Sequence, residues 1–458
     1  MTTPAPGEAR SPGLSYQQLL DTDSHAVPPV LRLESPRFLG DEDVPVSRYT
    51  AREWHEKEKR FLWDRVWQFV CRESQVADHG RYVVYDIGDR SYVVLRGQDG
   101  VLRGFVNACL HRGRRLKQYD GRCSEVRCPF HGFAWTLEGD LHDVPARWDF
   151  PHVRAEEWHL PEVAVNTWAG FVFLNPDPTA GPLSELVGGL DEQFARWDLE
   201  HRYVQLHVAK LNRCNWKVAQ EAFCEAFHVN ATHPEVSAYL GDTNSQVDIW
   251  DTFARVITPS LTPSPLLEWE PTEEDMARAM LDLRVDEPFP LDIPDGKTAR
   301  EVMAAATRDH WRAVVGDRVD EWCDAEYLDS IDYTLFPNFH PWGAYNRIVY
   351  RFRPNGDDHR TSIMEVLWLA PYREGERPPD AEIRWLDFPD QWSTVAEFGI
   401  LGKVFDQDFF NMEQVQRGLE ATRKPGVTLG NYQEAKVRWL QQTLGEWIER
   451  GEKEARDE

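Results

Sequence analysis

Short hydrophobic runs, broken by turn residues, fill the chain from about residue 80 to about residue 175. The runs are rich in valine, tyrosine and phenylalanine, and two of the breaks carry Gly-Asp-Arg and Gln-Asp-Gly. Such breaks are typical of turns between paired strands, so the pattern predicts a β-rich module. Its clearest strands are RYVVYDI (81–87), SYVVLRG (91–97), VLRGFVNA (101–108) and FVFLNPDP (171–178).

A polar, proline-bearing stretch, NPDPTAGPLSEL (175–186), follows this module and predicts a linker. Strand-like runs return beyond it, first in RYVQLHVAKLNRCNWK (202–217). A second module of mixed strands and helices is therefore expected. Its later strands are predicted at YTLFPNFH (333–340), NRIVYRFRP (346–354) and TSIMEVLWLAP (361–371).

Helix signals mark further segments. Thr50 and Glu53 form a capping box that predicts a helix running into FLWDRVW. Residues 271–325 have a charged, helical pattern, and a last helix is predicted to begin at Asn431/Glu434. The first of these two segments has capping boxes at Thr272/Asp275 and Thr298/Glu301, and the last helix has an apolar stripe of Val437, Leu440, Leu444 and Trp447.

The overall composition, with 41% hydrophobic and 28% charged residues in 458, is that of a globular protein with two or three domains. The net charge of −26 argues against nucleic acid or an anionic membrane surface as a partner. The 19 Trp, 14 Tyr and 22 Phe indicate either a large aromatic core or an aromatic-lined cavity.

Several features favour a cytoplasmic protein. The N-terminal MTTPAPGEARSPG has no apolar stretch, so no signal peptide is expected there. No run approaches the roughly 18 apolar residues of a membrane span. The 7 cysteines are odd in number and scattered, which does not suggest a disulfide framework.

The segment QEAFCEAFHVNATHP (220–234) gathers acids and histidines. On a helix, Glu221, Glu225 and His228 share one face. Pro234 should end this helix just before His233, because a residue that precedes proline avoids helical angles. A turn can then bring His233 back towards His228. Two imidazoles beside a carboxylate indicate the start of a metal site.

A second group of potential ligands lies in the β-rich module. Cys109 and His111 form a C-x-H pair, and Cys128 and His131 form a C-x2-H pair. Two thiolates and two imidazoles could hold zinc. However, each loop supplies one Cys and one His, a mixture that suits a [2Fe–2S] cluster whose cysteines bind one iron and whose histidines bind the other, as in Rieske centres.

These two motifs, in this order and preceded in the second module by Asn215-Trp216-Lys217, make the chain similar to the large (α) subunit of Rieske non-haem iron (ring-hydroxylating) oxygenases. The resemblance covers nearly the whole chain. It implies an α+β protein, with a β-rich Rieske domain and a helix-grip catalytic domain of antiparallel sheet and helices. The expected boundaries are an N-terminal segment and helix at 1–60, the Rieske domain at 61–178 and the catalytic domain at 179–458.

The resemblance also implies a mononuclear Fe(II) held by His228 and His233. The carboxylate that completes such a facial triad comes from a late helix in this family, which indicates the segment FDQDFFNMEQVQRGLEA (405–421). Asp408 matches the ligand position, and Asp406 is the rival. In a structural reading, either acid is a solvated group near a helix start.

Glu225 matches the family's bridging acid, which links a histidine of the mononuclear site to a Rieske histidine of the neighbouring subunit. The usual residue there is Asp, but relatives that act on quaternary ammonium compounds, such as carnitine oxygenases, also have Glu. Ala222 replaces the usual Asn after Glu221, which puts a contact near the iron in doubt.

The implied function is that of a terminal oxygenase. Electrons from NAD(P)H would arrive through a flavin reductase, a ferredoxin or both, and O2 would be used to mono- or cis-dihydroxylate an organic substrate. We expect a homotrimer, with a separate β subunit left open. An aromatic or polycyclic substrate is favoured, because residues 271–325 could cover a roomy cavity, and a quaternary ammonium compound is the alternative. The segment just before this region, with Leu266, Leu267 and Trp269, would be part of the lid.

Weaker candidates have ordinary explanations beside functional ones. Arg114, Arg115 and Lys117 form a basic patch that either docks an acidic ferredoxin or is a solvated loop. Two rival functions remain, a zinc-stapled helix-grip binding protein and a pure electron carrier, although a carrier would not need the mononuclear ligands. The residues expected only to pack or to lie on the surface are Cys123, Cys214, Cys224, His142, His152 and His159.

Overall fold

The computed structural model of the protein divides the chain into two units. It describes residues 7–8, 10–281 and 293–457. One unit consists of His55–Val187, Pro354–Asp358 and Trp447–Glu458. We refer to it as the Rieske unit because it holds the loops expected to bind a Rieske cluster. The other consists of Met1–Trp54, Gly188–Arg353 and His359–Glu446. We refer to it as the catalytic unit because it holds the residues expected to bind the mononuclear iron.

The β-rich pattern forms an antiparallel sheet in the Rieske unit, with strand order β2-β11-β10-β5-β4-β3-β6. The predicted strand RYVVYDI is confirmed as β3, because its register with β4 pairs Tyr82 with Leu95 and Ile87 with Arg90. The strands are β2 Gln68–Arg72, β3 Arg81–Ile87, β4 Arg90–Arg96, β5 Leu102–Val106, β6 Gly121–Arg122, β10 Glu162–Trp168 and β11 Phe171–Asn175. A smaller sheet holds β7 Val126–Arg127, β8 Ala134–Trp135 and β9 Leu141–Asp143.

The catalytic unit is built on an eight-stranded sheet of order β13-β14-β15-β16-β17-β18-β12-β19. The long β12 pairs antiparallel with β18 on one side and parallel with the short edge strand β19 on the other. Its strands are β12 Arg202–Asn212, β13 Gln246–Ile249, β14 Phe253–Thr258, β15 Ser330–Leu335, β16 Phe339–Pro341, β17 Ile348–Asn355, β18 Asp358–Pro371 and β19 Arg384–Leu386. A separate pair joins β1 Val44–Pro45 to β20 Gly426–Val427.

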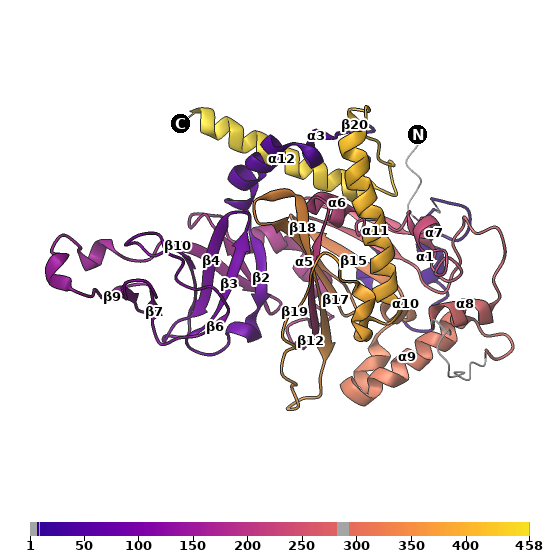
Figure 1. Cartoon of the computed structure of the whole chain (residues 1–458). Coiled ribbons are helices and arrows are strands. Elements are labelled where there is room, and N and C mark those ends of the chain that lie inside the picture. The colour runs from indigo at the N-terminus through magenta and orange to yellow at the C-terminus, as the bar shows by residue number, and fades with distance from the viewer. Residues whose placement is uncertain (1–6, 9, 282–292, 458) are drawn as a thin grey trace. The chain divides into compact units, whose positions relative to one another are not determined.

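Helices surround this sheet, and the long α11 lies along it (Figure 1). Two of the three predicted capping boxes are confirmed, at Thr272/Asp275 for α8 and at Thr298/Glu301 for α9. Thr50, of the predicted Thr50/Glu53 box, is instead the last residue of α3, and its hydroxyl donates to the Val46 carbonyl at 3.2 Å. The sheets and helices together confirm the α+β expectation. The helices are α1 Tyr16–Leu20, α2 Pro29–Arg32, α3 Ser47–Thr50, α4 Arg52–Glu58, α5 Leu183–Phe194, α6 Trp216–Glu221, α7 Val229–Thr232, α8 Glu273–Met280, α9 Ala299–Val315, α10 Asp324–Leu328, α11 Ile400–Ala421 and α12 Ala435–Asp457.

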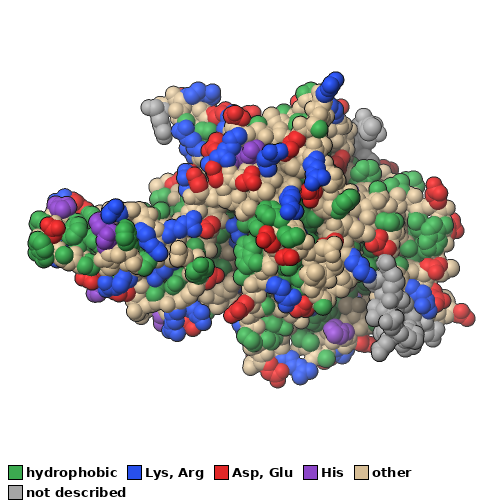
Figure 2. Space-filling view, in the orientation of Figure 1, with side chains coloured by type: hydrophobic (Ala, Val, Ile, Leu, Met, Phe, Trp, Pro, Cys, Tyr) green, Lys and Arg blue, Asp and Glu red, His purple; other side chains and the backbone are tan. Residues whose placement is uncertain are grey.

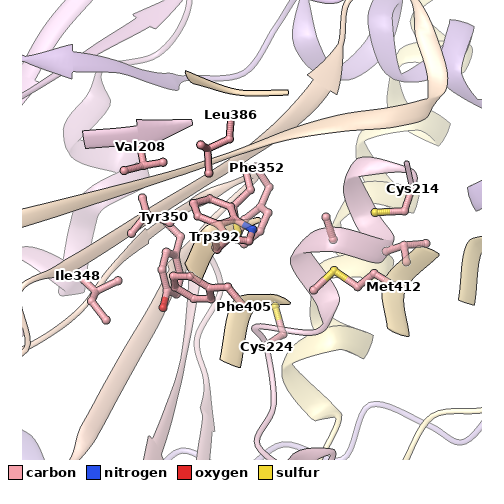
Figure 3. Close-up of a cluster of buried hydrophobic side chains, with 14 of the residues drawn as sticks. Val208, Cys214, Cys224, Ile348, Tyr350, Phe352, Leu386, Trp392, Phe405 and Met412 are labelled. Atoms are coloured by element: carbon pink, nitrogen blue, oxygen red, sulfur yellow. The ribbon is translucent and has the colours of Figure 1, made fainter. Parts of the chain in front are cut away.

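Aromatic side chains pack α11 against the sheet. Phe405 of α11 lies 5.1 Å from Trp392 and 6.0 Å from Tyr350 of β17, measured between ring centroids. Figure 3 shows these rings pointing toward one another, together with Phe352. The abundance of aromatic residues therefore serves at least in part to build this core.

Charged side chains of both signs are mixed on the surface shown in Figure 2. No single basic patch covers this face. Among the described residues, no helix has both the length and the apolar character to cross a membrane.

We expect Phe405→Ala to destabilise the catalytic unit by about 3–5 kcal/mol, because the ring is fully buried and its loss leaves a cavity in the core. Phe410→Ala on the same helix is the control, since that ring is 68% exposed and its loss should change stability by no more than about 0.5 kcal/mol. Thermal and denaturant unfolding, followed by circular dichroism, measures both. Equal effects of the two variants would contradict this view of how α11 packs.

Candidate metal centres

Three side chains of the catalytic unit converge as the second motif predicts. The Nε2 atoms of His233 and His228 lie 2.8 Å and 3.4 Å from Oδ1 of Asp408. The two imidazole centroids are 5.3 Å apart. Among the described residues, only these three form a group of His, Cys, Asp or Glu side chains whose ligand atoms all lie within 4.8 Å of one another.

Local backbone structure places the two histidines. The short helix α7 begins after His228 and has His233 as its C-cap, with φ −127° and ψ 59°. The helix therefore ends at His233, as Pro234 predicts. In contrast, Asp408 comes from the middle of α11, and it is 4% exposed. The reading of Asp408 as a solvated acid near a helix start is wrong.

Asp406, the rival acid, faces elsewhere. Its carboxylate accepts the backbone N–H groups of Trp392 at 2.7 Å and Ser393 at 3.2 Å. This acid therefore fixes the short turn that carries Trp392, and it takes no part in the group formed by the two histidines and Asp408.

The predicted continuous helix through Glu221, Glu225 and His228 is wrong. α6 ends at Glu221, and α7 does not begin until Val229. The Glu225 carboxylate accepts the backbone N–H of His228 at 3.0 Å, a donor that an α-helix would direct to the carbonyl of residue 224. The same carboxylate accepts from His228 Nδ1 at 2.7 Å, so Glu225 still contacts this histidine although no helix face joins them.

Acidic neighbours set the charge of this group. Burial alone lowers the pKa of His228, but the charge of Glu225 and the hydrogen bonds with Asp408 and Glu225 outweigh it and raise the pKa to about 10. Burial opposes the charged form of Asp408, yet its hydrogen bonds to His228 and His233 lower its pKa. The site therefore favours positive charge between the imidazoles. Two imidazoles and one carboxylate with these properties fit the facial triad of mononuclear Fe(II).

Two residues that the sequence did not single out, Gln407 and Glu235, form a series of hydrogen bonds that ends at Nδ1 of His233. Gln407 Oε1 lies 2.7 Å from His233 Nδ1, and Gln407 Nε2 donates to Glu235 Oε1 at 2.8 Å. Their only signal in the sequence is position, since Gln407 precedes Asp408 and Glu235 follows the His233-Pro234 pair.

The two ligand loops of the Rieske unit repeat one backbone geometry. Cys109 N–H donates to the Arg114 carbonyl and Cys128 N–H donates to the Phe133 carbonyl, each at 2.8 Å. In each loop a glycine N–H then donates back to the cysteine carbonyl, and both glycines, Gly113 and Gly132, have positive φ values of 73° and 83°. Only glycine adopts such angles without strain, so the glycine after each histidine is needed for the turn.

The four side chains on these loops lie together but do not surround one point. Cys109 and Cys128 are buried, and the rings of His111 and His131 are 4.7 Å apart. A tetrahedral zinc would bring its ligand atoms to within about 3.3–3.8 Å of one another. Within the described chain, no three of these four residues form a group within 4.8 Å. That spread suits a two-iron cluster better than a single zinc ion.

One nitrogen in this group strengthens the fit. Nδ1 of His111 is buried and has no hydrogen-bond partner within the described residues. A buried polar atom of this kind normally has a partner, and a metal ligand bond would supply it. The loops therefore fit a [2Fe–2S] cluster by residue type, spacing and the one unpartnered nitrogen.

The remaining cysteines and histidines show no such arrangement. Cys214 and Cys224 are buried in the core shared by the sheet and α11, which confirms the packing prediction. His159 lies within hydrogen-bond distance of Asp140 and Glu162 at the surface. Within the described residues, no disulfide joins any of the seven cysteines.

A cavity of about 660 Å³ opens beside the group of His228, His233 and Asp408. Glu221, Glu225 and Glu434 are on its wall, among apolar side chains of α11 and α12. Burial raises the pKa of Glu221 to about 7, against the hydrogen bonds from Gln441 and Tyr49 that lower it.

The predicted lid, residues 271–325 with Leu266, Leu267 and Trp269 ahead of it, is described only in part. Leu266 and Trp269 are 47% and 52% exposed, and neither they nor residues 271–281 and 293–325 line this cavity. Residues 282–292 of the predicted lid lie outside the described residues.

Comparisons with known proteins identify two families along the chain. Residues 192–450 match the family described as ring hydroxylating alpha subunit (catalytic domain), and residues 66–154 match the Rieske [2Fe–2S] domain. The carnitine monooxygenase oxygenase subunit of Escherichia coli (strain K12) is 31% identical over 197 residues, which is 42% of this chain and 53% of that protein. The biphenyl 2,3-dioxygenase subunit alpha of Rhodococcus jostii (strain RHA1) is 29% identical over 207 residues, which is 44% of this chain and 45% of that protein.

Solved structures show the same fold. A quaternary ammonium Rieske monooxygenase in complex with L-carnitine has a TM-score of 0.63 and 17% identity, with 89% of this chain and 95% of that chain covered. Naphthalene 1,2-dioxygenase from Rhodococcus sp. bound to indole has a TM-score of 0.58 and 20% identity, with 89% and 94% covered.

The matched sequence spans about half the length of the curated relatives, whereas the family match to the catalytic domain alone covers more than half of this chain. The chain therefore belongs to the family of ring-hydroxylating oxygenase α subunits, with a Rieske [2Fe–2S] domain ahead of the family's catalytic domain.

Proposed function

We propose that the protein is the terminal oxygenase of a Rieske-type system, which uses electrons from NAD(P)H and O2 to hydroxylate an organic substrate. The observation that carries this proposal is that His228, His233 and Asp408 converge in one unit, while the other unit holds a separate Cys/His group. A bound mononuclear iron supplies the activation of O2 in such enzymes.

The chain's own residues would hold two metal groups. His228, His233 and Asp408 would bind the mononuclear iron and leave neighbouring positions open. In the Rieske unit, Cys109 and Cys128 would bind one iron of the cluster, and His111 and His131 would bind the other. Glu225 would orient His228 by accepting its Nδ1–H, which keeps the Nε2 lone pair on the side of Asp408.

We further propose that electrons reach this site from the cluster of a neighbouring subunit in a homotrimer. Inter-subunit electron transfer is described for a related quaternary ammonium Rieske monooxygenase. In this chain, carboxylates line the cavity beside Glu225, while Arg112, Phe130 and His131 are exposed at the tip of the Rieske loops. A basic and aromatic tip is complementary to an acidic recess, and a ring of such heterologous contacts closes most simply as a trimer.

The electron donor to the cluster is proposed to be a ferredoxin or a flavin reductase. Arg114, Arg115 and Lys117 are close to the ligand Cys109 in the chain, and a cation there would attract an acidic donor. Arg115 also pairs with Asp86 at 3.1 Å, so the positive charge of this patch is partly neutralised.

For the substrate, a quaternary ammonium compound is our first candidate. The spacing Glu221-x3-Glu225-x2-His228 carries Glu at the position where carnitine oxygenases also have it. Relatives include oxygenase subunits that act on carnitine and on glycine betaine, the latter 28% identical.

An aromatic hydrocarbon is the second candidate. Relatives include biphenyl and chlorobenzene dioxygenase α subunits at 29% and 30% identity. The identities do not separate the two classes, so the choice requires a direct test.

The first test concerns the metals. We expect purified protein to contain one [2Fe–2S] cluster and one further iron per chain. His111→Ala should abolish the visible spectrum of the cluster, whereas Asp408→Ala should keep that spectrum and lose only the further iron. Iron and acid-labile sulfide analysis with absorption spectroscopy measures this. Zinc without sulfide would instead indicate a binding protein stapled by zinc.

Asp406→Ala is the matched control for Asp408→Ala. Its carboxylate caps backbone N–H groups, so its loss should leave both metals in place and cost only some stability. Loss of the further iron in Asp406→Ala alone would mean that the third ligand was assigned to the wrong aspartate.

The second test concerns the route of the electrons. Glu225→Gln keeps the size of the side chain but removes its charge. The carboxylate of Glu225 accepts from two N–H groups of His228, and the NH2 group of the glutamine would face one of them. We expect the reduced cluster to form normally, while its oxidation on reaction with O2 and substrate slows by orders of magnitude. Single-turnover stopped-flow absorption measures both steps. Glu413→Gln on α11, which removes only a surface pair with Arg417, is the control. A wild-type rate in Glu225→Gln would show that this acid is not the bridge.

The third test addresses substrate class. Peroxide-driven turnover of the iron-loaded protein avoids the need for a redox partner. We expect oxidised product from carnitine or glycine betaine and none from biphenyl or naphthalene, as measured by mass spectrometry. Product from the hydrocarbons alone would favour the second candidate, and Asp408→Ala should abolish product in either case.

A further inference from the structure

Two neighbouring residues of α11, Gln407 and Asp408, contact the two ring nitrogens of His233. Asp408 Oδ1 lies 2.8 Å from His233 Nε2, and Gln407 Oε1 lies 2.7 Å from His233 Nδ1. The imidazole is 2% exposed, so water cannot take over either contact. Gln407 in turn donates from Nε2 to Glu235 Oε1 at 2.8 Å. These contacts form one series of hydrogen bonds from Glu235 through Gln407 to His233.

The acceptor at its end, the carboxylate of Glu235, determines the direction of every hydrogen bond in this series. A carboxylate only accepts, so the amide nitrogen of Gln407 must face Glu235. The amide oxygen then faces His233, and Nδ1 has to be the donor. Nε2 donates to the Asp408 carboxylate, and a metal ion that displaces this proton leaves the neutral ring with its proton on Nδ1 and the Nε2 lone pair as the ligand.

Without Glu235, the amide would have two orientations. If it turned round, its NH2 group would face Nδ1, which would then have to accept. The proton of the neutral ring would move to Nε2, the atom that has to bind the metal. A buried ring has no water to correct this, so the orientation of Gln407 decides whether His233 can act as a ligand.

His228 is held differently. Its Nδ1 faces Glu225, and a carboxylate accepts through either oxygen, so it needs no further residue to orient it. The two ligands thus have unlike partners, a charged one for His228 and a neutral one for His233. Only the neutral partner requires a second residue to fix its direction.

We infer that Gln407 and Glu235 are positioning residues that keep His233 in the tautomer able to bind the mononuclear iron. The inference rests on the proposed function, because it assumes that His228, His233 and Asp408 hold iron. Neither residue touches the metal position. Their effect is exerted through the ring of His233 alone.

The test is the affinity of the mononuclear site for Fe(II), measured by anaerobic titration of full-length protein that retains its [2Fe–2S] cluster but has lost the other iron. Gln407→Leu should weaken binding about 10- to 100-fold. Glu235→Leu should weaken it less, because some amide groups still point the right way. Gln391→Leu, the same change at an exposed glutamine of the catalytic unit, should have no effect.

A variant with a carboxylate at position 407 distinguishes control of the His233 tautomer from a simple packing effect. Gln407→Glu should bind Fe(II) at least as tightly as the wild type, because a carboxylate accepts from Nδ1 in any orientation. In that background Glu235→Leu should no longer weaken binding, and removing a second nearby carboxylate should even help folding. Circular dichroism confirms that each variant is folded.

The outcomes are distinct. Wild-type affinity in Gln407→Leu, or an equal loss from Glu235→Leu in both backgrounds, would overturn the inference while the iron site stands. Wild-type protein that binds Fe(II) no better than His228→Ala would overturn the proposed function, and this inference with it. Loss in Gln407→Leu with rescue by Gln407→Glu would support it.

Discussion

A buried carboxylate held between two imidazoles is the interaction on which the catalytic unit depends. Burial alone disfavours the charged form of Asp408, and its contacts with His228 and His233 reverse that preference. Since an uncompensated buried charge would be strongly destabilising, α11 and the histidine segment have to stay in register. The aromatic packing of Phe405, one turn before Asp408, holds that register against the sheet. Stability and site geometry therefore have the same physical origin.

The acidic residues around the proposed iron site carry a charge that balances that of a divalent cation. Asp408 and Glu225 bring two negative charges, which a divalent cation neutralises. A third carboxylate at position 407 would leave the buried group with a net negative charge, and the neutral amide avoids this. However, an amide can point in either of two directions. Glu235 fixes the direction of the Gln407 amide by accepting from its Nε2. The unlike partners of the two histidines follow from this balance.

The two ligand groups are built in opposite ways. In the Rieske unit, each loop is closed by backbone bonds within a few residues, and a glycine with positive φ follows each histidine. In the catalytic unit, His233 and Asp408 are 175 positions apart and meet only because α11 packs on the sheet. A change in the core near α11 should therefore disturb the proposed iron site more than the cluster. Electrons would have to pass between two centres whose geometries are set independently.

Local features could be predicted from the sequence because neighbouring residues decide them. The β3 strand, the capping boxes of α8 and α9, the end of α7 at His233 and the two Cys/His loops are all of this kind. The family resemblance added Asp408, but only the tertiary structure turns Asp406 away, to the backbone of Trp392 and Ser393. The structure also shows two features that no local pattern indicated: the break at Glu225, whose side chain replaces a helical carbonyl as acceptor of the His228 N–H, and the tertiary contact of Gln407 and Glu235 behind His233. Such contacts join residues far apart in the chain or compete with local propensity, so no local pattern contains them.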